Sequence, residues 1–218
     1  EAYSERDALR EQESAWTGQF GVVYDTKRDV YLYGHWHNSF EPTLTLDKDN
    51  ALLPPTRGRE FEFGVKYLPK NSSTQITASV FDLRRQNVHV AVPGTTYFDA
   101  IGEIASKGVE LEYRAAIHKR LYLLGSYTYL DSSVTKDANP RRIGRRPQGV
   151  PRHAFNLRFD AVLQRYADGD LTFGLGMRYL GERLDESNRI TLGGSTVFDA
   201  SLRLTRGNDA LTFHVRNL

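Results

Sequence analysis

Two histidines separated by one residue are the first feature of this chain that could do chemistry. His35 and His37 follow Tyr31 and Tyr33 in a pattern in which every second residue is aromatic or imidazole. In a strand, residues two apart point to the same face, so these rings are expected to lie together. Sequence spacing places no carboxylate or third histidine beside the pair, as a metal site would need. We therefore expect polar surface groups or ligand contacts at Tyr33, His35 and His37, and no metal site.

The second feature is a run of arginines in a segment that also carries proline and glycine. Arg141, Arg142, Arg145 and Arg146 are close in sequence, and Arg152 follows them. Guanidinium groups form paired hydrogen bonds with phosphate and carboxylate. Nucleic-acid sites interleave such cations with aromatic side chains, and that interleaving is missing here. The run predicts either an anion-binding loop or a solvated loop, and no nucleic-acid partner.

A third candidate is the aromatic pair Tyr97 and Phe98, which follows a Val-Pro-Gly-Thr-Thr segment. Recognition loops favour rigid aromatic side chains, so the pair is a candidate ligand contact. It can equally pack the loop against its neighbours.

Arrangements typical of enzymes are missing from the sequence. The segment Gly193-Gly-Ser-Thr196 lacks the strand–turn–helix setting of a nucleophilic serine. Glycine-rich phosphate loops are absent, and the chain has no cysteine for a disulfide or a thiolate metal site. We expect no catalytic residues, no enzyme activity and no cofactor.

Strand-like alternation is the pattern that must position these candidates. Residues 60–67 read Glu-Phe-Glu-Phe-Gly-Val-Lys-Tyr, which is apolar at every second position. The same period predicts an all-β fold of ten antiparallel strands. The predicted strands span residues 16–24, 30–40, 60–68, 74–85, 108–116, 121–130, 153–163, 171–181, 196–204 and 210–218.

The connections between these strands alternate in length. Tight turns at 25–29, 69–73, 117–120, 164–170 and 205–209 alternate with long segments at 41–59, 86–107, 131–152 and 182–195. All short turns would then lie at one end of the sheet and all long loops at the other, which is typical of a transmembrane β-barrel. Phe61, Phe63 and Val65 would face lipid, and Glu60 and Glu62 a wet lumen. A soluble antiparallel barrel is the alternative.

Composition agrees with either kind of barrel. Apolar residues make up 39% of the 218 residues, and no apolar run approaches a membrane helix. Barrel strands carry only alternate apolar residues, so average hydropathy does not reveal them. Residues 1–14 are polar and include no apolar signal segment, so an exported protein would have its N-terminus upstream.

Several stretches, in order, resemble the carboxy-terminal barrel of TonB-dependent ferric-siderophore receptors. They are VYLYGHWHNSFEP (30–42), LPPTRGREFEFGVKY (53–67), ASVFDLRRQNV (78–88), GEIASKGVELE (102–112), LGSYTYLD (124–131), GVPRH (149–153), TVFDASLR (196–203) and FHVRNL (213–218). Each stretch alone is weak, whereas the ordered set covers nearly all of the chain after residue 16.

The resemblance implies one domain, residues 1–218, that forms part of a barrel of about 22 strands. The plug domain, the TonB box, the first half of the barrel and the last strand would be absent from this chain. The whole protein is expected to be monomeric, to lie in the outer membrane of a Gram-negative bacterium and to import a ferric siderophore.

The expected partners are that siderophore, the TonB–ExbB–ExbD system acting through the plug, and outer-membrane lipid and lipopolysaccharide. Matching residues suggest a hydroxamate-type or mixed chelate, while a catecholate or another chelated metal stays open. The alternatives are an outer-membrane barrel enzyme and a soluble β-barrel binding protein.

Overall fold

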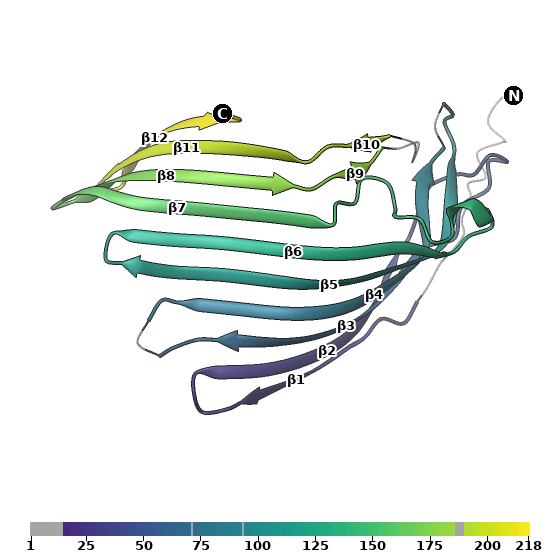
Figure 1. Cartoon of the computed structure of the whole chain (residues 1–218), viewed down its shortest axis with the longest axis horizontal. Helices are drawn as coiled ribbons and strands as arrows, with labels where there is room; N and C mark the ends of the chain where they lie inside the picture. Colours follow the sequence, from purple (N-terminus) through teal and green to yellow (C-terminus); the bar gives the residue numbers. More distant parts are fainter. Residues whose placement is uncertain (1–14, 71, 93, 186–189) are drawn as a thin grey trace, which may run out of the picture.

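In this computed structural model, residues 15–70, 72–92, 94–185 and 190–218 are described. Their main element is one antiparallel ten-stranded sheet in which neighbours in sequence are neighbours in space (Figure 1). Its strands are β1 (Gln19–Asp25), β2 (Val30–Glu41), β3 (Thr56–Tyr67), β4 (Gln75–Ala91), β5 (Phe98–His118), β6 (Leu121–Lys136), β7 (His153–Tyr166), β8 (Gly169–Leu180), β11 (Ser195–Arg206) and β12 (Asp209–Arg216). The predicted all-β meander is confirmed, with β1 and β12 at opposite edges.

Three minor elements lie in the long connections. The 3₁₀-helix η1 (Pro140–Arg142) follows β6, and the short strands β9 (Arg183–Leu184) and β10 (Thr191–Leu192) pair between β8 and β11. Among the described residues, no helix is long and apolar enough to span a membrane.

Alternation along β3 separates two faces of the sheet. Phe61, Phe63 and Val65 are 48%, 64% and 36% exposed and share a face with their cross-strand partners Trp36 and Leu32. A water-soluble sheet would bury such a face against a second layer. Here the main sheet leaves it uncovered, and the opposite face carries the polar residues.

The limit of the apolar face on the side of the long connections shifts from strand to strand. Phe61 of β3 is apolar, whereas Asp82 of β4, Lys107 of β5 and Asp131 of β6 stand in the same hydrogen-bonded row. On β6 the last apolar position before the charge is Tyr129, one step further toward the short turns. Strands that tilt relative to a membrane plane produce this stagger.

Several strands are longer than the sequence predicted, and β4, β5 and β6 differ most. β4, β5 and β6 continue into the segments expected to be loops, so only residues 92–97 connect β4 to β5. The predicted limits were wrong there because the outward positions become charged beyond the apolar face, which ends the alternating signal. The extensions pack on a small cluster of Ile101, Ile104 and Val134, beside Val88 and Val90.

The tight turns lie together at one end of the sheet, on the left in Figure 1, and the long connections at the other. In the turn between β1 and β2, Asp25 accepts a hydrogen bond from the Lys27 backbone N–H at 2.7 Å. Lys27 and Asp29 adopt φ values of 64° and 60°, which reverse the chain in few residues. The predicted asymmetry of the two ends is thus confirmed.

Candidate functional site

The polar face of β2 and β3 holds the first group of candidate residues. Tyr33, His35 and His37 lie in a column, with 6.4 Å between the ring centroids of the first two and 5.6 Å between those of the histidines. Pairing with β3 sets Glu62 opposite His35 and Glu60 opposite His37. The structure therefore supplies the carboxylates that the sequence spacing did not place beside the histidines.

Glu62 connects this column internally. Its carboxylate accepts a hydrogen bond from the Tyr33 hydroxyl and lies 3.9 Å from Nε2 of His35. The Glu62 side chain is 17% exposed, so water screens these contacts only in part. The tyrosine hydroxyl thereby fixes the position of the carboxylate beside the imidazole.

The arginine run lies on a connection that folds back on β6. Asn139 caps the short helix η1 by accepting a hydrogen bond from the Arg141 backbone N–H. Two backbone bonds at 2.8 and 2.9 Å then join Gly144 and Arg145 to Val134. Gly144 has a φ of 79°, which favours glycine at this reversal. The loop is therefore held by hydrogen bonds rather than freely solvated.

The arginines differ in their partners. Nη1 of Arg142 donates to Asp99 at 2.7 Å and lies 3.6 Å from Asp137, so this guanidinium ties the loop to β5. Arg146 donates to the backbone oxygen of Glu182 at 3.4 Å. The guanidinium groups of Arg141 and Arg145 make no hydrogen bond or ion pair with any residue that the structure describes.

A cavity of about 640 Å³ lies between this loop and the polar face of the sheet. Its wall includes carboxylates from β3 and β5, and its loop side carries guanidinium groups. The charged lining residues are Glu60, Glu62, Glu110, Arg85, Arg142, Arg145 and Arg146. The same cavity also has the apolar residues Phe81, Leu83 and Val90 in its lining, so it offers both apolar surface and charged groups.

The remaining candidates lie outside this lining. Arg141 is exposed on η1, Tyr97 ends the β4–β5 connection and Phe98 is the first residue of β5. The Phe98 backbone N–H donates to Leu46 at 3.1 Å, which docks this connection on the β2–β3 loop. The structure thus joins Arg142, Arg145 and Arg146 with the carboxylates beside the histidine column, and separates Arg141, Tyr97 and Phe98 from them.

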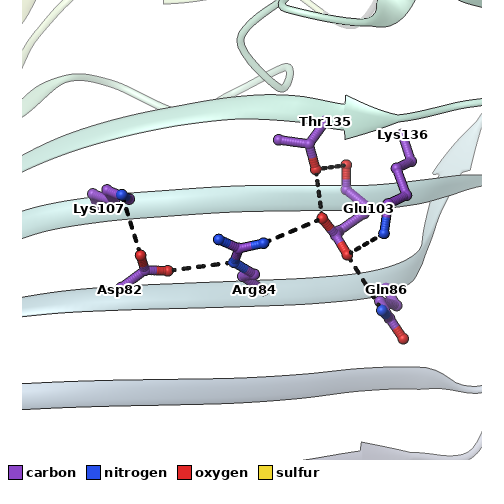
Figure 2. Close-up of polar contacts among 7 residues, drawn as sticks. All are labelled: Asp82, Arg84, Gln86, Glu103, Lys107, Thr135 and Lys136. Carbon is purple, nitrogen blue, oxygen red and sulfur yellow. Dashed lines mark hydrogen bonds and ion pairs between the residues drawn. The ribbon is translucent and has the colours of Figure 1, made fainter.

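Glu103 is a buried carboxylate that the sequence did not single out. It accepts hydrogen bonds from the Thr135 hydroxyl at 2.8 Å and from Nζ of Lys136 at 3.0 Å (Figure 2). These donors, the Thr135 hydroxyl first, lower the pKa of Glu103 to about 2. Arg84 lies 4.0 Å from the same carboxylate.

The contacts continue from Glu103 along β4. Arg84 lies 3.7 Å from Asp82, which in turn lies 3.3 Å from Nζ of Lys107 (Figure 2). This charged ladder stands on the same sheet side as the apolar face, directly beyond its limit. It fastens β4, β5 and β6 where they extend past that face.

Register is the signal that would have identified the missed carboxylates. Glu60, Glu62 and Glu103 are far in sequence from the residues they serve, and only the pairing of β2 with β3, or of β5 with β6, brings them together. The alternation of side chains along β3 was enough to place Glu60 and Glu62 on the polar face. It could not identify their cross-strand partners on β2.

The family model for the β-barrel of TonB-dependent receptors matches residues 2–218. The ferrichrome outer membrane transporter/phage receptor of Escherichia coli is 34% identical over 97% of this chain and 29% of its own length. The ferrioxamine B receptor of Salmonella typhimurium is 34% identical over 82% of this chain and 25% of its own length. The chain thus spans less than a third of these relatives.

Solved structures agree on the fold. The ferric yersiniabactin uptake receptor FyuA of Yersinia pestis superposes with a TM-score of 0.72 at 19% identity, over 93% of this chain and 32% of its own. The siderophore receptor PiuA of Acinetobacter baumannii gives 0.71 at 23% identity, over 92% and 31%. At such identities the likeness shows the shared barrel wall alone.

Proposed function

Since this chain belongs to the TonB-dependent receptor family as part of its β-barrel, we propose that it forms part of the wall of an outer-membrane receptor that imports a ferric siderophore. The names of its relatives, a ferrichrome transporter and a ferrioxamine B receptor, support this substrate class. The complete protein would be a monomer of about 22 strands around a plug. The TonB–ExbB–ExbD system would transmit the energy for ligand import through that plug.

The cavity beneath the arginine loop is the observation that carries this proposal. It opens on the polar face, at the end of the sheet that bears the long connections. In the proposed barrel this end faces the cell exterior, because outer-membrane barrels place their long loops outside. Arg145 brings to the cavity a guanidinium that has no partner among the described residues, and carboxylate or hydroxamate oxygens of a chelate are suitable acceptors.

Binding in this proposal needs no covalent chemistry. Apolar lining residues such as Phe81 and Leu83 would contact the ligand body, while the charged groups would orient its oxygens. The histidine column lies beside the same wall and would meet the ligand, or the plug, further along the lumen. Tyr97 and Phe98 remain proposed contacts at the loop tip.

We propose outer-leaflet lipopolysaccharide as the lipid partner of the outward face. Arg57 and Arg59 of β3 lie on that face beyond Phe61, toward the long connections. Their guanidinium groups contact no acidic group among the described residues. Together with Arg84 and Lys107 they place cations directly beyond the apolar face. Phosphate groups of lipopolysaccharide would lie at this height, where bidentate arginine contacts are strongest.

Equilibrium binding tests the proposed substrate class. The full-length protein, purified in detergent, is titrated with ferric ferrichrome, ferric ferrioxamine B and a ferric catecholate while tryptophan fluorescence is followed. At least one ferric chelate is expected to bind saturably. The iron-free form of that same chelator is expected to bind more weakly. Failure to bind any chelate in folded, heat-modifiable protein would contradict the proposal.

A further inference from the structure

The polar face of β2 and β3 carries a group of ligand atoms suited to a metal ion. One ligand atom each from His35, His37 and Glu60 lies within 4.8 Å of the others. Among the residues that the structure describes, no other group of three histidine, aspartate or glutamate side chains brings its ligand atoms so close. We propose that these three residues bind a divalent transition-metal ion, with Zn²⁺ as the best match.

Backbone geometry places the two histidine side chains on the same side of the sheet. His35 and His37 are separated by one residue on β2, so their imidazoles leave the strand on the same side. Glu60 is the direct cross-strand partner of His37. Directly opposed residues have Cβ atoms about 5 Å apart, within the reach of an imidazole and a carboxylate that share one ion.

The separation of the ligand atoms requires only side-chain adjustment. Metal–nitrogen and metal–oxygen bonds of about 2.0–2.2 Å put neighbouring ligands of a zinc ion roughly 3.3 Å apart. The three ligand atoms lie within 4.8 Å of one another, and rotation of the three half-buried side chains would bring them to that shorter distance without movement of the strands. Gly21, the partner of His35 on β1, presents no side chain to obstruct that movement.

Glu62 supplies the support that metal-bound histidines commonly have. A second carboxylate that accepts a hydrogen bond from the imidazole fixes the ring and raises its basicity. The Glu62 carboxylate is held by the Tyr33 hydroxyl and lies 3.9 Å from Nε2 of His35, which is longer than a hydrogen bond, so a rotation of the imidazole would be needed to form one. The column therefore combines three ligands with an orienting carboxylate behind them.

Two nitrogen ligands and one oxygen ligand suit zinc better than the hard cations. Ca²⁺ and Mg²⁺ prefer oxygen ligands alone, whereas Zn²⁺ accepts imidazole and carboxylate together. Glu60 and Glu62 also give this part of the polar face a negative charge, which favours a cation. Three protein ligands leave a coordination position open to water or to another group in the lumen.

This inference goes beyond the proposed import of a ferric chelate and does not depend on it. Zinc binding is measured in the full-length, detergent-solubilised protein by competition with a chromogenic zinc chelator, and Co²⁺ substitution provides an absorption spectrum. The wild-type protein is expected to bind one ion at this site. His37→Ala and the isosteric Glu60→Gln should each weaken zinc binding about tenfold or more, and Glu62→Gln by a similar factor or less.

His89→Ala is the matched control, because His89 also lines the polar face but bonds to Thr43 and to the backbone of Pro54. This variant should bind zinc as the wild type does. Heat modifiability on gels confirms that every variant keeps its barrel. Wild-type protein without stoichiometric zinc, or equal zinc affinity in wild type, His37→Ala and Glu60→Gln, would overturn the proposal. Ferric chelate titrations on the same samples report the proposed import function separately.

Discussion

At the scale of single residues, neighbouring arginines of one loop have different surroundings. Arg142 forms ion pairs with Asp99 and Asp137, whereas Arg145 lines the cavity and has no ion-pair partner in the part of the chain that the structure describes. Arg141 lies on the same loop but outside the lining. The sequence could predict an anion-binding run, but it could not tell these roles apart because the loop's backbone bonds to β6 decide which guanidinium turns inward.

The first prediction compares these two residues. Arg145→Ala should weaken binding of the preferred ferric chelate by about 1.5–3 kcal/mol, because a charged hydrogen bond is lost. Arg141→Ala should change it by less than about 0.5 kcal/mol. Fluorescence titration of both variants measures the difference. Equal losses in the two variants would show that the loop acts only through its overall charge.

Glu103 gives a second prediction, on pH. Its pKa is about 2 in the folded protein, below the ordinary value of 4.5, so the ionised form stabilises the fold above that ordinary value. The contribution is lost as pH falls from about 4.5 toward 2. Allowing for screening by solvent, it amounts to about 1–2 kcal/mol.

Limited proteolysis of the β4–β6 extensions between pH 7 and pH 3 measures this effect. The wild type should become more sensitive as the pH falls, and Glu103→Gln should be sensitive already at neutral pH and change less. Lys48→Gln, on an exposed loop ion pair with Asp49, is the matched control and should follow the wild type. A Glu103→Gln variant as resistant as wild type at pH 7 contradicts the assigned role.

At the scale of the elements, the sequence predicted most strand limits closely. It missed the end of β4, the start of β5 and the end of β6, which all lie on the side of the long connections. Alternation is visible only while one face is apolar, so it predicted the membrane-spanning part of β4, β5 and β6. Beyond Asp82 and Lys107 both faces are polar or mixed, and the ladder around Glu103 extends the strands without an alternating pattern. Long-range hydrogen bonding, which no local pattern reports, set those limits.

The third prediction tests the assignment of the two faces on a single strand. Leu111 and Glu112 of β5 are adjacent and point to opposite sides, with Leu111 43% exposed on the apolar face. Leu111→Arg would place a charge in lipid and should cost about 2–4 kcal/mol. Glu112→Arg, on the wet side, should cost less than about 1 kcal/mol.

Denaturant unfolding of both variants in lipid bilayers provides the comparison. Both variants introduce the same arginine at adjacent positions of one strand, so they differ chiefly in the face that receives the charge. A larger loss for Glu112→Arg than for Leu111→Arg would reverse the assigned faces.

At the scale of the whole molecule, the open apolar face is the property that separates a membrane wall from a soluble barrel. Phe63 and Phe213 of the single sheet are 64% and 68% exposed, and no second layer among the described residues covers them. The sequence could predict this class from the lengths of the connections and the ordered resemblance. It could not predict the cavity, which exists because the 137–152 loop folds back over the polar face.

The fourth prediction concerns the environment of the complete protein. Expressed in a Gram-negative host, it should fractionate with the outer membrane and leave it only with detergent. A protein that stays monomeric in buffer without detergent would favour the soluble β-barrel alternative. Recovery in the outer membrane together with hydrolase activity that depends on His153 or Ser195 would favour a barrel enzyme instead.

Energy-dependent iron uptake tests the central proposal most directly. Cells that lack their own receptors for the chosen siderophore are supplied with the full-length protein, and accumulation of radioactive iron from that ferric siderophore is measured with and without TonB. Accumulation is expected to require both the protein and TonB, and to fall in Arg145→Ala but not in Arg141→Ala. Folded receptor in the outer membrane that imports iron from no ferric siderophore, or imports it equally without TonB, would contradict the proposal.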